Sequence, residues 1–450
     1  MLAQFSITNF LSFREKATFS MVKSKTAKGL PSHVFPINET MSLLRGAAFY
    51  GANGSGKSNF VKALLFAQQL LVEGVEPKKP LDVRPFKLDK ALHKSPSEFE
   101  FILLIDGDFY TYGFHVDRQR VIREWLYRDA QGRDSLCFER VTNTEGVAEV
   151  RFGQEGVQRS EEEAQFLRFV ARGTRENQLF LNATIQNNLT DFAPIDRWFR
   201  ESLVIISSDR RYAHNEVRPV QDADYTSTLA LFLSKVGLGI HDADSKRIPL
   251  EEVNFLSKEV LERLLTTTPA QDGEYIALEN GSAFVAEVQE GVTDAYCLLL
   301  RLYHSDSEGK SVEFFVEEES DGTRRLIELH PLLTLLHSVN ACSVVVVDEL
   351  DRHLHAHVTR HFLQLALAGS DNPLPTQLLF TAHDATLIAP DVLRADEIWF
   401  VEKDTAGATQ LASLVEFKYP TGLELTKGYL SGRFGAIPFL GDPQILSTPF

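Results

Sequence analysis

The stretch Gly51-Ala52-Asn53-Gly54-Ser55-Gly56-Lys57-Ser58 satisfies the pattern G-x-x-x-x-G-K-[ST] and decides the expected fold. It follows an apolar segment typical of a strand, residues 46–50, and precedes residues 59–73, which are apolar at helical spacing. A strand, a glycine-rich turn and a helix in this order point successive backbone N–H groups at phosphate oxygens. We therefore predict a nucleotide-binding loop, in which Lys57 reaches the β- and γ-phosphates of ATP and Ser58 ligates Mg²⁺. A glycine-rich turn without a ligand is the alternative.

A second apolar strand, expected at residues 343–347, ends in the adjacent carboxylates Asp348 and Glu349. In a nucleotide site Asp348 would hold Mg²⁺, directly or through water, and Glu349 would orient or deprotonate the attacking water. Apolar strands also end in acidic pairs for purely structural reasons. The phosphate loop in the same chain favours the functional interpretation.

Two further segments fit a nucleotide site. Residues 377–384 form an apolar strand that ends at His383, where an imidazole can hydrogen-bond a γ-phosphate and respond to its loss. The stretch ESDGTRRL at residues 319–326 is a turn ahead of a helix, and its Ser320 hydroxyl and Gly322 N–H can also bind a γ-phosphate. If the two motifs lie on opposite sides of one head, the nucleotide would be sandwiched between two chains. A plain N-capped helix fits residues 319–326 equally well.

Composition limits the class of protein. The chain has 450 residues, 44% hydrophobic and 24% charged, which is typical of a globular protein and excludes a mostly disordered one. No apolar stretch approaches the roughly 20 residues that cross a bilayer, and the first residues lack the pattern of an export signal. Three widely spaced cysteines indicate reduced thiols, so we expect a cytoplasmic protein.

The charge balance argues against a general nucleic-acid coat, because the formal net charge is -16. Acidic side chains concentrate in residues 241–330, where they outnumber basic ones 20 to 8. The first 50 residues carry 6 basic and 2 acidic side chains, so a local DNA contact stays open without being required. A solvated acidic face explains residues 241–330 more simply than a dedicated partner surface.

The order of elements predicts an α/β fold. Strand patterns near the N-terminus include a hairpin at Asp106-Gly107, which indicates an antiparallel β subregion. Residues 160–202 and 251–265 have helical patterns, which predict a helical lobe between the phosphate loop and residues 319–326. Strands then alternate with helices, as in a parallel sheet with crossover helices. We expect three parts: 1–155 and 311–450 for the head, and 156–310 for the lobe.

Together these motifs resemble an ABC-type ATPase head of the SMC, RecF and OLD kind. GANGSGKS is similar to Walker A, ESDGTRRL to the signature motif, VVVVDEL at residues 344–350 to Walker B, and FTAHD at residues 380–384 to the histidine switch. The resemblance implies an ATPase acting as a homodimer or higher homo-oligomer. It also implies a glutamine that links Mg²⁺ to the lobe, for which Gln186 is the candidate, with a surface residue at a helix end as the alternative.

A narrower resemblance is to the bacterial RloA and AriA (PARIS) group of antiphage-defence ATPases. It rests on FSITNFLSFRE at residues 5–15, PFKLD at residues 85–89, ESDGTRRL, and GYLSGRFGAIPFL at residues 428–440. This implies an ATPase that controls a separate effector, often a nuclease, in response to a phage trigger protein. The TOPRIM nuclease of the PARIS system is one such effector. OLD-type proteins carry a nuclease after the ATPase. Because no acidic strand-end cluster such as D-x-D follows His383, we expect no fused nuclease.

Other interpretations stay open. A RecF-like repair protein would bind DNA itself, and a silent scaffold would bind ATP without turnover. Arg14, just past the first strand, would contact phosphate or a neighbouring carboxylate. His353, His357 and His361 follow one another at intervals of four residues, so we expect them on one helical face that could bind zinc, although the glutamate of an H-E-x-x-H motif is missing.

Overall fold

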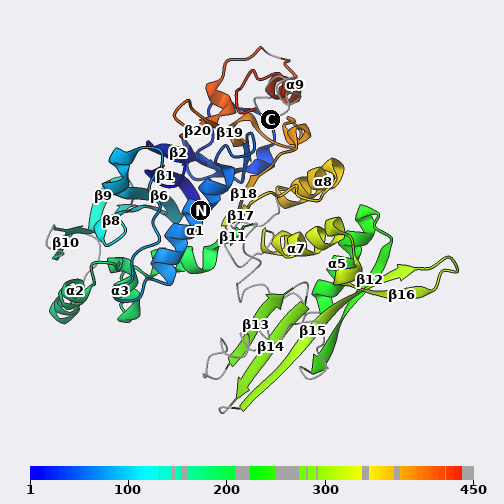
Figure 1. Cartoon of the computed structure of the whole chain (residues 1–450), viewed down its shortest axis with the longest axis horizontal. Coiled ribbons are helices and arrows are strands. Elements are labelled where there is room, and N and C mark those ends of the chain that lie inside the picture. The colour runs from blue at the N-terminus through cyan, green and yellow to red at the C-terminus, as the bar shows by residue number, and fades with distance from the viewer. Residues whose placement is uncertain are drawn as a thin grey trace, which may run out of the picture. The chain divides into compact units, whose positions relative to one another are not determined.

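The computed structural model describes residues 1–130, 132–143, 147–153, 160–207, 223–249, 273–279, 282–289, 292–336, 344–368, 376–420 and 422–437 (Figure 1). The chain divides into two compact units. Unit 1 comprises Met1–Ser207, Leu336–Leu350 and Leu363–Phe450, and unit 2 comprises Ser208–Leu335 and Asp351–Phe362. The predicted boundaries at 155 and 310 do not coincide with this division, because residues 160–207 belong to unit 1.

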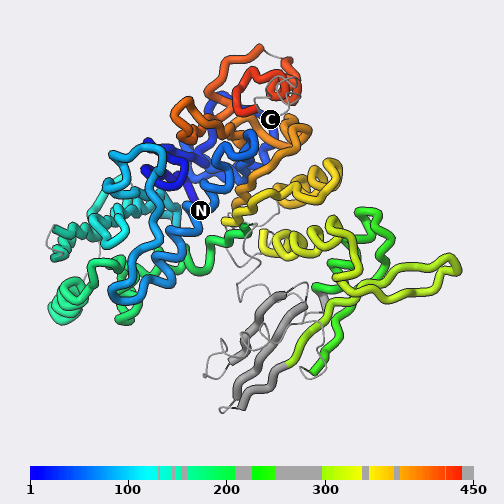
Figure 2. Tube along the Cα trace, viewed as in Figure 1, coloured from blue at the N-terminus to red at the C-terminus, as the bar shows by residue number. Residues whose placement is uncertain are grey.

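A six-stranded sheet at the centre of unit 1 confirms the predicted α/β class. Its order is β11-β17-β18-β5-β19-β20, and all neighbours are parallel except β19 and β20. The strands are β11 Leu203–Ile206, β17 Val344–Val347, β18 Gln377–Thr381, β5 Gly46–Tyr50, β19 Ile398–Lys403 and β20 Thr409–Ser413. Strand β5, from the N-terminal part, pairs with β18 and β19 from the C-terminal part, and Figure 2 shows blue and orange segments of the chain together in this region.

A seven-stranded antiparallel sheet forms the predicted β subregion. The strands, in spatial order, are β10 Ala148–Phe152, β9 Arg133–Thr142, β8 Val121–Ala130, β7 Asp108–Val116, β6 Ser97–Ile105, β1 Leu2–Thr8 and β2 Ala17–Ser20. Asp106 and Gly107 join β6 to β7 with φ of 51° and 89°, the left-handed conformation of a two-residue hairpin turn. A separate two-stranded sheet pairs β3 Val34–Pro36 with β4 Ser42–Leu44.

Helix α1 (Lys57–Val72) joins the two larger sheets through one aromatic ring. Phe60 lies 4.5 Å from Phe49 of β5, 5.4 Å from Phe19 of β2 and 5.6 Å from Phe5 of β1, measured between ring centroids. All four rings are buried. Because Phe60 follows Lys57 and Ser58 within the first turn of the helix, this packing fixes where α1 begins.

The remaining helices of unit 1 are short. They are α2 Glu161–Gly173, α3 Phe180–Gln186, α4 Ala193–Arg197, the π-helical turn Trp198–Ser202 and α9 Leu425–Leu430. Single 3-10 turns occupy Pro31–His33, Lys90–Lys94, Ala385–Leu387, Ala395–Glu397 and Leu414–Glu416. Tyr429 and Phe434 of the C-terminal segment stack on Phe400 of β19 at 5.4 and 5.5 Å; the last three residues of the quoted motif, 438–440, lie outside the described residues.

A buried acid holds α3 against the antiparallel sheet. The Glu124 carboxylate accepts hydrogen bonds from the backbone N–H groups of Phe180 and Leu181 at 2.6 and 3.0 Å, and from the Tyr112 hydroxyl at 3.0 Å. The Arg140 guanidinium lies 4.0 Å away and donates to the backbone carbonyl of Arg175 at 2.9 Å. Burial raises the pKa of Glu124, while Arg140 acts in the opposite direction. This contact explains why the helices after residue 160 belong to unit 1.

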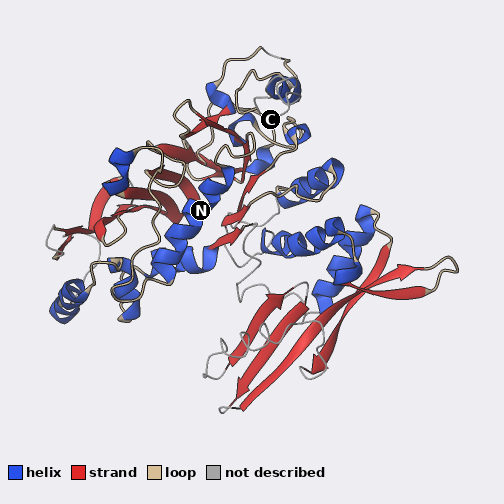
Figure 3. Ribbon diagram, viewed as in Figure 1, coloured by secondary structure: helices blue, strands red, loops and turns tan. Residues whose placement is uncertain are grey.

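Unit 2 corrects the prediction of a helical lobe. Besides α5 Ala223–Val236 and α7 Asp321–Leu336, it contains a five-stranded antiparallel sheet in the order β12-β15-β14-β13, with β16 paired to β15 (Figure 3). The strands are β12 Ile240–Pro249, β13 Gly273–Glu279, β14 Ser282–Gln289, β15 Val292–Ser305 and β16 Ser311–Phe315. The apolar run from Tyr296 to Leu300 is too short to distinguish a buried strand from a helix by periodicity. The predicted helix at 251–265 lies outside the described residues.

The 3-10 turn Val316–Glu318 leads into α7, and helix α8 (Ala356–Ala366) follows the acidic strand β17. Among the helices that the structure describes, none is both long and apolar enough to cross a membrane.

We predict that Glu124→Ala lowers the free energy of unfolding by about 3 to 5 kcal/mol, because it leaves the buried Arg140 charge without its acid. Urea unfolding followed by circular dichroism measures the change. The matched control is Glu139→Ala, which removes the partner of the half-exposed Arg123 and should cost less than about 1 kcal/mol. Equal destabilisation by the two variants would contradict the conclusion that Glu124 compensates a buried charge.

The buried His330 of α7 predicts a pH dependence for unit 2. Its ring packs 5.1 Å from that of Tyr225 and 5.6 Å from that of Phe232, and burial lowers its pKa from 6.5 to about 4. Between these pH values the unfolded chain binds a proton that the folded ring does not, so stability falls as the pH falls. We expect a loss of up to about 3 kcal/mol by pH 4, and a smaller loss in His330→Leu. Thermal unfolding of the wild type and of His330→Leu across this pH range tests the prediction. If the stability of both proteins changes equally with pH, the prediction is wrong.

Candidate nucleotide site

The loop Gly51–Gly56 connects the fully buried strand β5 to α1 and has the backbone geometry of a phosphate cradle. Gly54 and Gly56 adopt φ of 77° and 120°, values that residues other than glycine rarely adopt. A Cβ on Gly56 would also collide with the Thr409 side chain, and one on Gly51 with the carbonyl oxygen of Val401. The glycines of the motif therefore let the loop pass close to β19 and β20.

Hydrogen bonds among Ser12, Asn59 and Thr409 hold the loop in place. Thr409 Oγ1 lies 2.7 Å from both the Ser55 carbonyl oxygen and the Ser12 hydroxyl. The Asn59 side chain donates to the same Ser12 hydroxyl at 2.8 Å, and the Thr409 N–H donates to the Ser12 carbonyl at 2.7 Å. Strand β20, the segment after β1 and the first turn of α1 are thus bonded together around the loop.

The polar groups of the loop suit a phosphate. Lys57 Nζ is folded over the loop, donating to the carbonyl oxygens of Gly51 at 2.7 Å and Ala52 at 3.2 Å. The Ser55 hydroxyl is buried and has no hydrogen-bond partner within the described residues. A buried hydroxyl without a partner costs free energy, and a phosphate oxygen is an acceptor that would satisfy it.

The Asp348 carboxylate connects the loop to two other strands. Asp348 follows β17 and is buried, and its Oδ1 accepts from Ser58 Oγ at 3.2 Å and from Thr381 Oγ1 at 2.7 Å. Thr381 Oγ1 in turn accepts from the Glu349 backbone N–H at 2.7 Å. An acid and a hydroxyl at this distance form an oxygen-rich pair of the kind that Mg²⁺ binds.

Glu349 and His383 lie together at the same edge of the sheet. The distance from His383 Nε2 to Glu349 Oε1 is 3.9 Å, and the side chains are 44% and 34% exposed, so solvent reaches both. Glu349 has a φ of 53°, an unfavourable conformation for a residue with a side chain. Such backbone strain, about 1 kcal/mol or more, persists where the surrounding structure imposes it and is common at functional sites.

Ser320 and Gly322 belong to unit 2. Ser320 Oγ accepts from the Thr323 N–H at 3.1 Å, as an N-cap of α7 does, and Gly322 lies close to the backbone carbonyl of His353. The residue before this turn, Glu319, is held by His304 of β15 through a 2.6 Å bond between Nε2 and Oε1. The sheet of unit 2 therefore supports the turn directly.

Gln186 and Arg14 make contacts away from the acidic pair. Gln186 ends α3, and within the described residues its amide oxygen accepts from Gln178 at 2.8 Å, with no bond to Ser58 or Asp348. Arg14 pairs with Asp89 of the PFKLD segment at 2.8 Å. We expected Arg14 to contact either phosphate or a neighbouring carboxylate, and in the structure it contacts the carboxylate of Asp89.

No group of three or more His, Cys, Asp or Glu side chains suited to a metal occurs in the part of the chain that the structure describes. The rings of His355 and His357 stack at 5.3 Å.

The sequence motifs did not reveal Thr381, Thr409 or Ser12. Thr381 sits within FTAHD, and a hydroxyl at the end of a parallel strand beside an acidic strand end is a usable signal. Thr409 and Ser12 have no local signal, because Thr409 lies hundreds of residues away in the sequence from Ser12 and Ser55, the residues to which it is bonded.

Residues 47–389, most of the chain, match the family described as "AAA domain, putative AbiEii toxin, Type IV TA system". This chain belongs to that family. As an AAA-domain protein it is a P-loop ATPase.

Solved structures similar to this ATPase include SMC heads. The SMC head domain from Thermotoga maritima is 14% identical with a TM-score of 0.37, covering 92% of this chain and 98% of that one. An SMC head bound to the C-winged helix domain of ScpA is 15% identical with a TM-score of 0.40, covering 92% and 99%. No curated protein matches the chain.

The position of Thr381 leads to a prediction for this ATPase. Thr381→Val removes the hydroxyl that bonds both Asp348 and the Glu349 N–H, so we expect turnover to fall by about tenfold or more. The control is Thr381→Ser, which keeps the hydroxyl and should retain most of the activity. Phosphate release at saturating ATP measures both. Wild-type turnover in Thr381→Val would show that the bridge has no part in the reaction.

Proposed function

We propose that this protein is an ATP-binding and ATP-hydrolysing head of the ABC type that controls a separate effector in an antiphage defence system. The observation that carries the ATPase part is the Asp348 carboxylate, which lies within hydrogen-bonding distance of Ser58 and Thr381 and has Glu349 next to it in the chain. The defence role rests on the resemblance to RloA and AriA. The family's description, which names a putative AbiEii toxin of a type IV TA system, is compatible with that role.

Binding of the triphosphate would use the loop Gly51–Ser58. Backbone N–H groups at Asn53 to Lys57 would face the phosphates, and the Ser55 hydroxyl would donate to one of them. Lys57 would exchange its two carbonyl acceptors for the β- and γ-phosphates, a short movement of an amine already held over the loop.

Ser58 and Asp348 would hold Mg²⁺, which when bound neutralises phosphate charge. Thr381 keeps the Asp348 carboxylate oriented toward Ser58. In this proposal Gln186 joins the metal shell only if α3 changes its present contact with Gln178.

Glu349 would accept a proton from the attacking water, and His383 would hydrogen-bond the γ-phosphate. The distance of 3.9 Å between His383 Nε2 and Glu349 Oε1 supports this division of roles, because both side chains could then reach groups around one oxygen. The strained φ of Glu349 and the hydrogen bond from its N–H to Thr381 hold the backbone from which the Glu349 side chain extends.

Completion of the site would require a second copy of the chain. Ser320 and Gly322 would bind the γ-phosphate of the partner in a homodimer or larger homo-oligomer, so that hydrolysis weakens the engagement of the heads. The effector, for which a TOPRIM-type nuclease is the candidate, and a phage trigger protein would bind to the heads in the cytoplasm.

We predict that Glu349→Gln lowers turnover by about a hundredfold or more and accumulates an ATP-bound dimer, because the nucleotide binds without being hydrolysed. Light scattering after gel filtration with Mg²⁺ and ATP measures the dimer. Adding Ser320→Arg should return the protein to monomer while ATP still binds. Unchanged phosphate release in Glu349→Gln would refute the catalytic assignment; a dimer that survives Ser320→Arg would refute the role of the turn.

The control over an effector separates this proposal from a RecF-like protein that binds DNA directly. Co-purification with the product of the neighbouring gene supports the effector model. Salt-dependent affinity of the isolated protein for duplex DNA, without such a partner, supports the alternative.

A further inference from the structure

Strand β10 ends the seven-stranded sheet of unit 1 and leaves one edge of that sheet open. It pairs with β9 on one side, and no strand in the described part of the chain pairs with it on the other. At the start of this pair the N–H of Asn143 donates to the carbonyl oxygen of Val147 at 2.9 Å. Because hydrogen-bonded positions alternate along an antiparallel pair, the backbone groups of Ala148, Val150 and Phe152 point toward the open edge.

The side chains on the outer face of β10 carry opposite charges. Glu149 and Arg151 are exposed, and neither has an ion pair with another described residue. If β10 pairs antiparallel with β10 of a second copy, about a two-fold axis through Val150, Glu149 of each copy lies opposite Arg151 of the other. The same register sets the outward-facing backbone groups of Val150 against each other, and those of Ala148 against those of Phe152.

This register satisfies both the backbone and the charges, and its neighbours do not. A shift by one residue would set outward-facing backbone groups against residues that face β9. A two-fold axis through Glu149 would bring two glutamates together, and one through Arg151 would bring two arginines together, so like charges would repel. An edge that is protected by charge against pairing repels a copy in every register. The charges of β10 are self-complementary in one.

Helix α2 adds apolar surface beside this edge, and Figure 1 shows it next to β10 at the end of the sheet. Its buried Leu167 and Val170 belong to the core cluster against which Val150 packs. Phe166 and Phe169, one turn apart on the same helix, are 44% and 72% exposed, and such exposed apolar pairs are typical of interaction surfaces. A two-fold axis perpendicular to the sheet places the α2 helices of both copies on one face, where these rings can cover apolar surface of the joined sheet.

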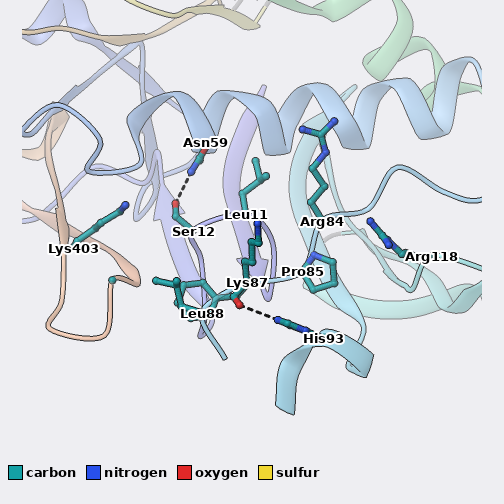
Figure 4. A pocket seen from close by; sticks show the side chains of 12 residues that line it. Leu11, Ser12, Asn59, Arg84, Pro85, Lys87, Leu88, His93, Arg118 and Lys403 are labelled. Atoms are coloured by element: carbon teal, nitrogen blue, oxygen red, sulfur yellow. Dashed lines mark hydrogen bonds between the residues drawn. The ribbon is translucent and has the colours of Figure 1, made fainter. Parts of the chain in front are cut away.

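We propose that β10 binds β10 of a second copy, which joins two seven-stranded sheets into one continuous sheet across a two-fold axis at Val150. The contact needs no nucleotide. It therefore differs from the engagement through Ser320 and Gly322 proposed above, and it would link ATP-bound dimers into a larger assembly. Among the described residues, none from β10 or α2 lines the cavity of about 720 Å³ beside the phosphate loop, where Figure 4 shows Ser12 and Asn59.

An extended segment of another protein is the competing occupant of the edge. Such a segment would use the same outward-facing backbone groups, but it would not require the charges of β10 to match one another. The opposite signs at Glu149 and Arg151, in the one register that also pairs the backbone, favour the second copy.

The first test reverses these charges and measures self-association of the full chain without nucleotide by sedimentation velocity. We expect the wild type to associate at about 100 µM, and Arg151→Glu or Glu149→Arg to raise the dissociation constant about tenfold or more, because each sets like charges opposite each other. An equal mixture of the two variants brings opposite charges together again, so it should associate as the wild type does. The matched control is Lys235→Glu, a reversal at an exposed position of α5, which should change nothing.

The second test locates the axis by chemical crosslinking. In the proposed register the Val150 residues of the two copies face each other with a Cα separation of about 5.5 Å, whereas the Ala148 residues lie four positions apart, or about 14 Å. A thiol crosslinker shorter than the second distance should therefore join copies of Val150→Cys and not of Ala148→Cys, above the background from the native cysteines.

Each other outcome overturns the proposal. If the wild type is monomeric without nucleotide, or Arg151→Glu associates as tightly as the wild type, β10 does not join copies. If the mixture of variants stays monomeric, or Ala148→Cys crosslinks as readily as Val150→Cys, the copies meet in another register. If Arg151→Glu instead loses a co-purifying protein, the edge belongs to that protein. The ATPase function is tested separately by phosphate release, so it stands or fails independently of these results.

Discussion

The Asp348 carboxylate is the contact on which the arrangement of the site depends. It receives hydrogen bonds from Ser58 at the start of α1 and from Thr381 at the end of β18, and it directly follows β17. These groups meet because β17, β18 and β5 are neighbouring parallel strands, whose carboxyl ends lie at one edge of the sheet. A buried carboxylate is costly unless it is hydrogen-bonded, so the same bonds that orient it make its burial tolerable.

The rigidity of this edge comes from the aromatic core below it. Phe60 packs on rings from both large sheets, which fixes the position of α1 relative to β5 and limits the freedom of the loop between them. Thr409 and Ser12 add hydrogen bonds on the outer side of the loop. The flexible glycines are thus held between two well-packed elements, as phosphate-binding loops require.

The residues proposed to bind and hydrolyse ATP are divided between the two compact units. Unit 1 carries the loop, the acidic pair and His383, whereas unit 2 carries the turn at Ser320 and Gly322 on its own sheet and helix. The bond between His304 and Glu319 makes the sheet of unit 2 part of the support for that turn. Under the proposed function, such a division would let each unit stay rigid while contacts between copies change.

Local sequence determined the elements with strong patterns. Short-range constraints, namely glycine conformations, apolar runs and turn residues, were enough to predict four of them. These are the strand, loop and helix around GANGSGKS, the strand ending in Asp348-Glu349, the strand ending near His383 and the Asp106-Gly107 hairpin. Tertiary structure decided the rest. Residues 160–202 join unit 1 because Glu124, far away in the sequence, caps α3. The segment between α5 and α7 contains a sheet because each strand is stabilised by partner strands that no local pattern encodes. The roles of Thr381, Thr409 and the lining of the cavity likewise depend on which strands are neighbours, since hydrogen bonds and pockets form between residues that only folding brings together.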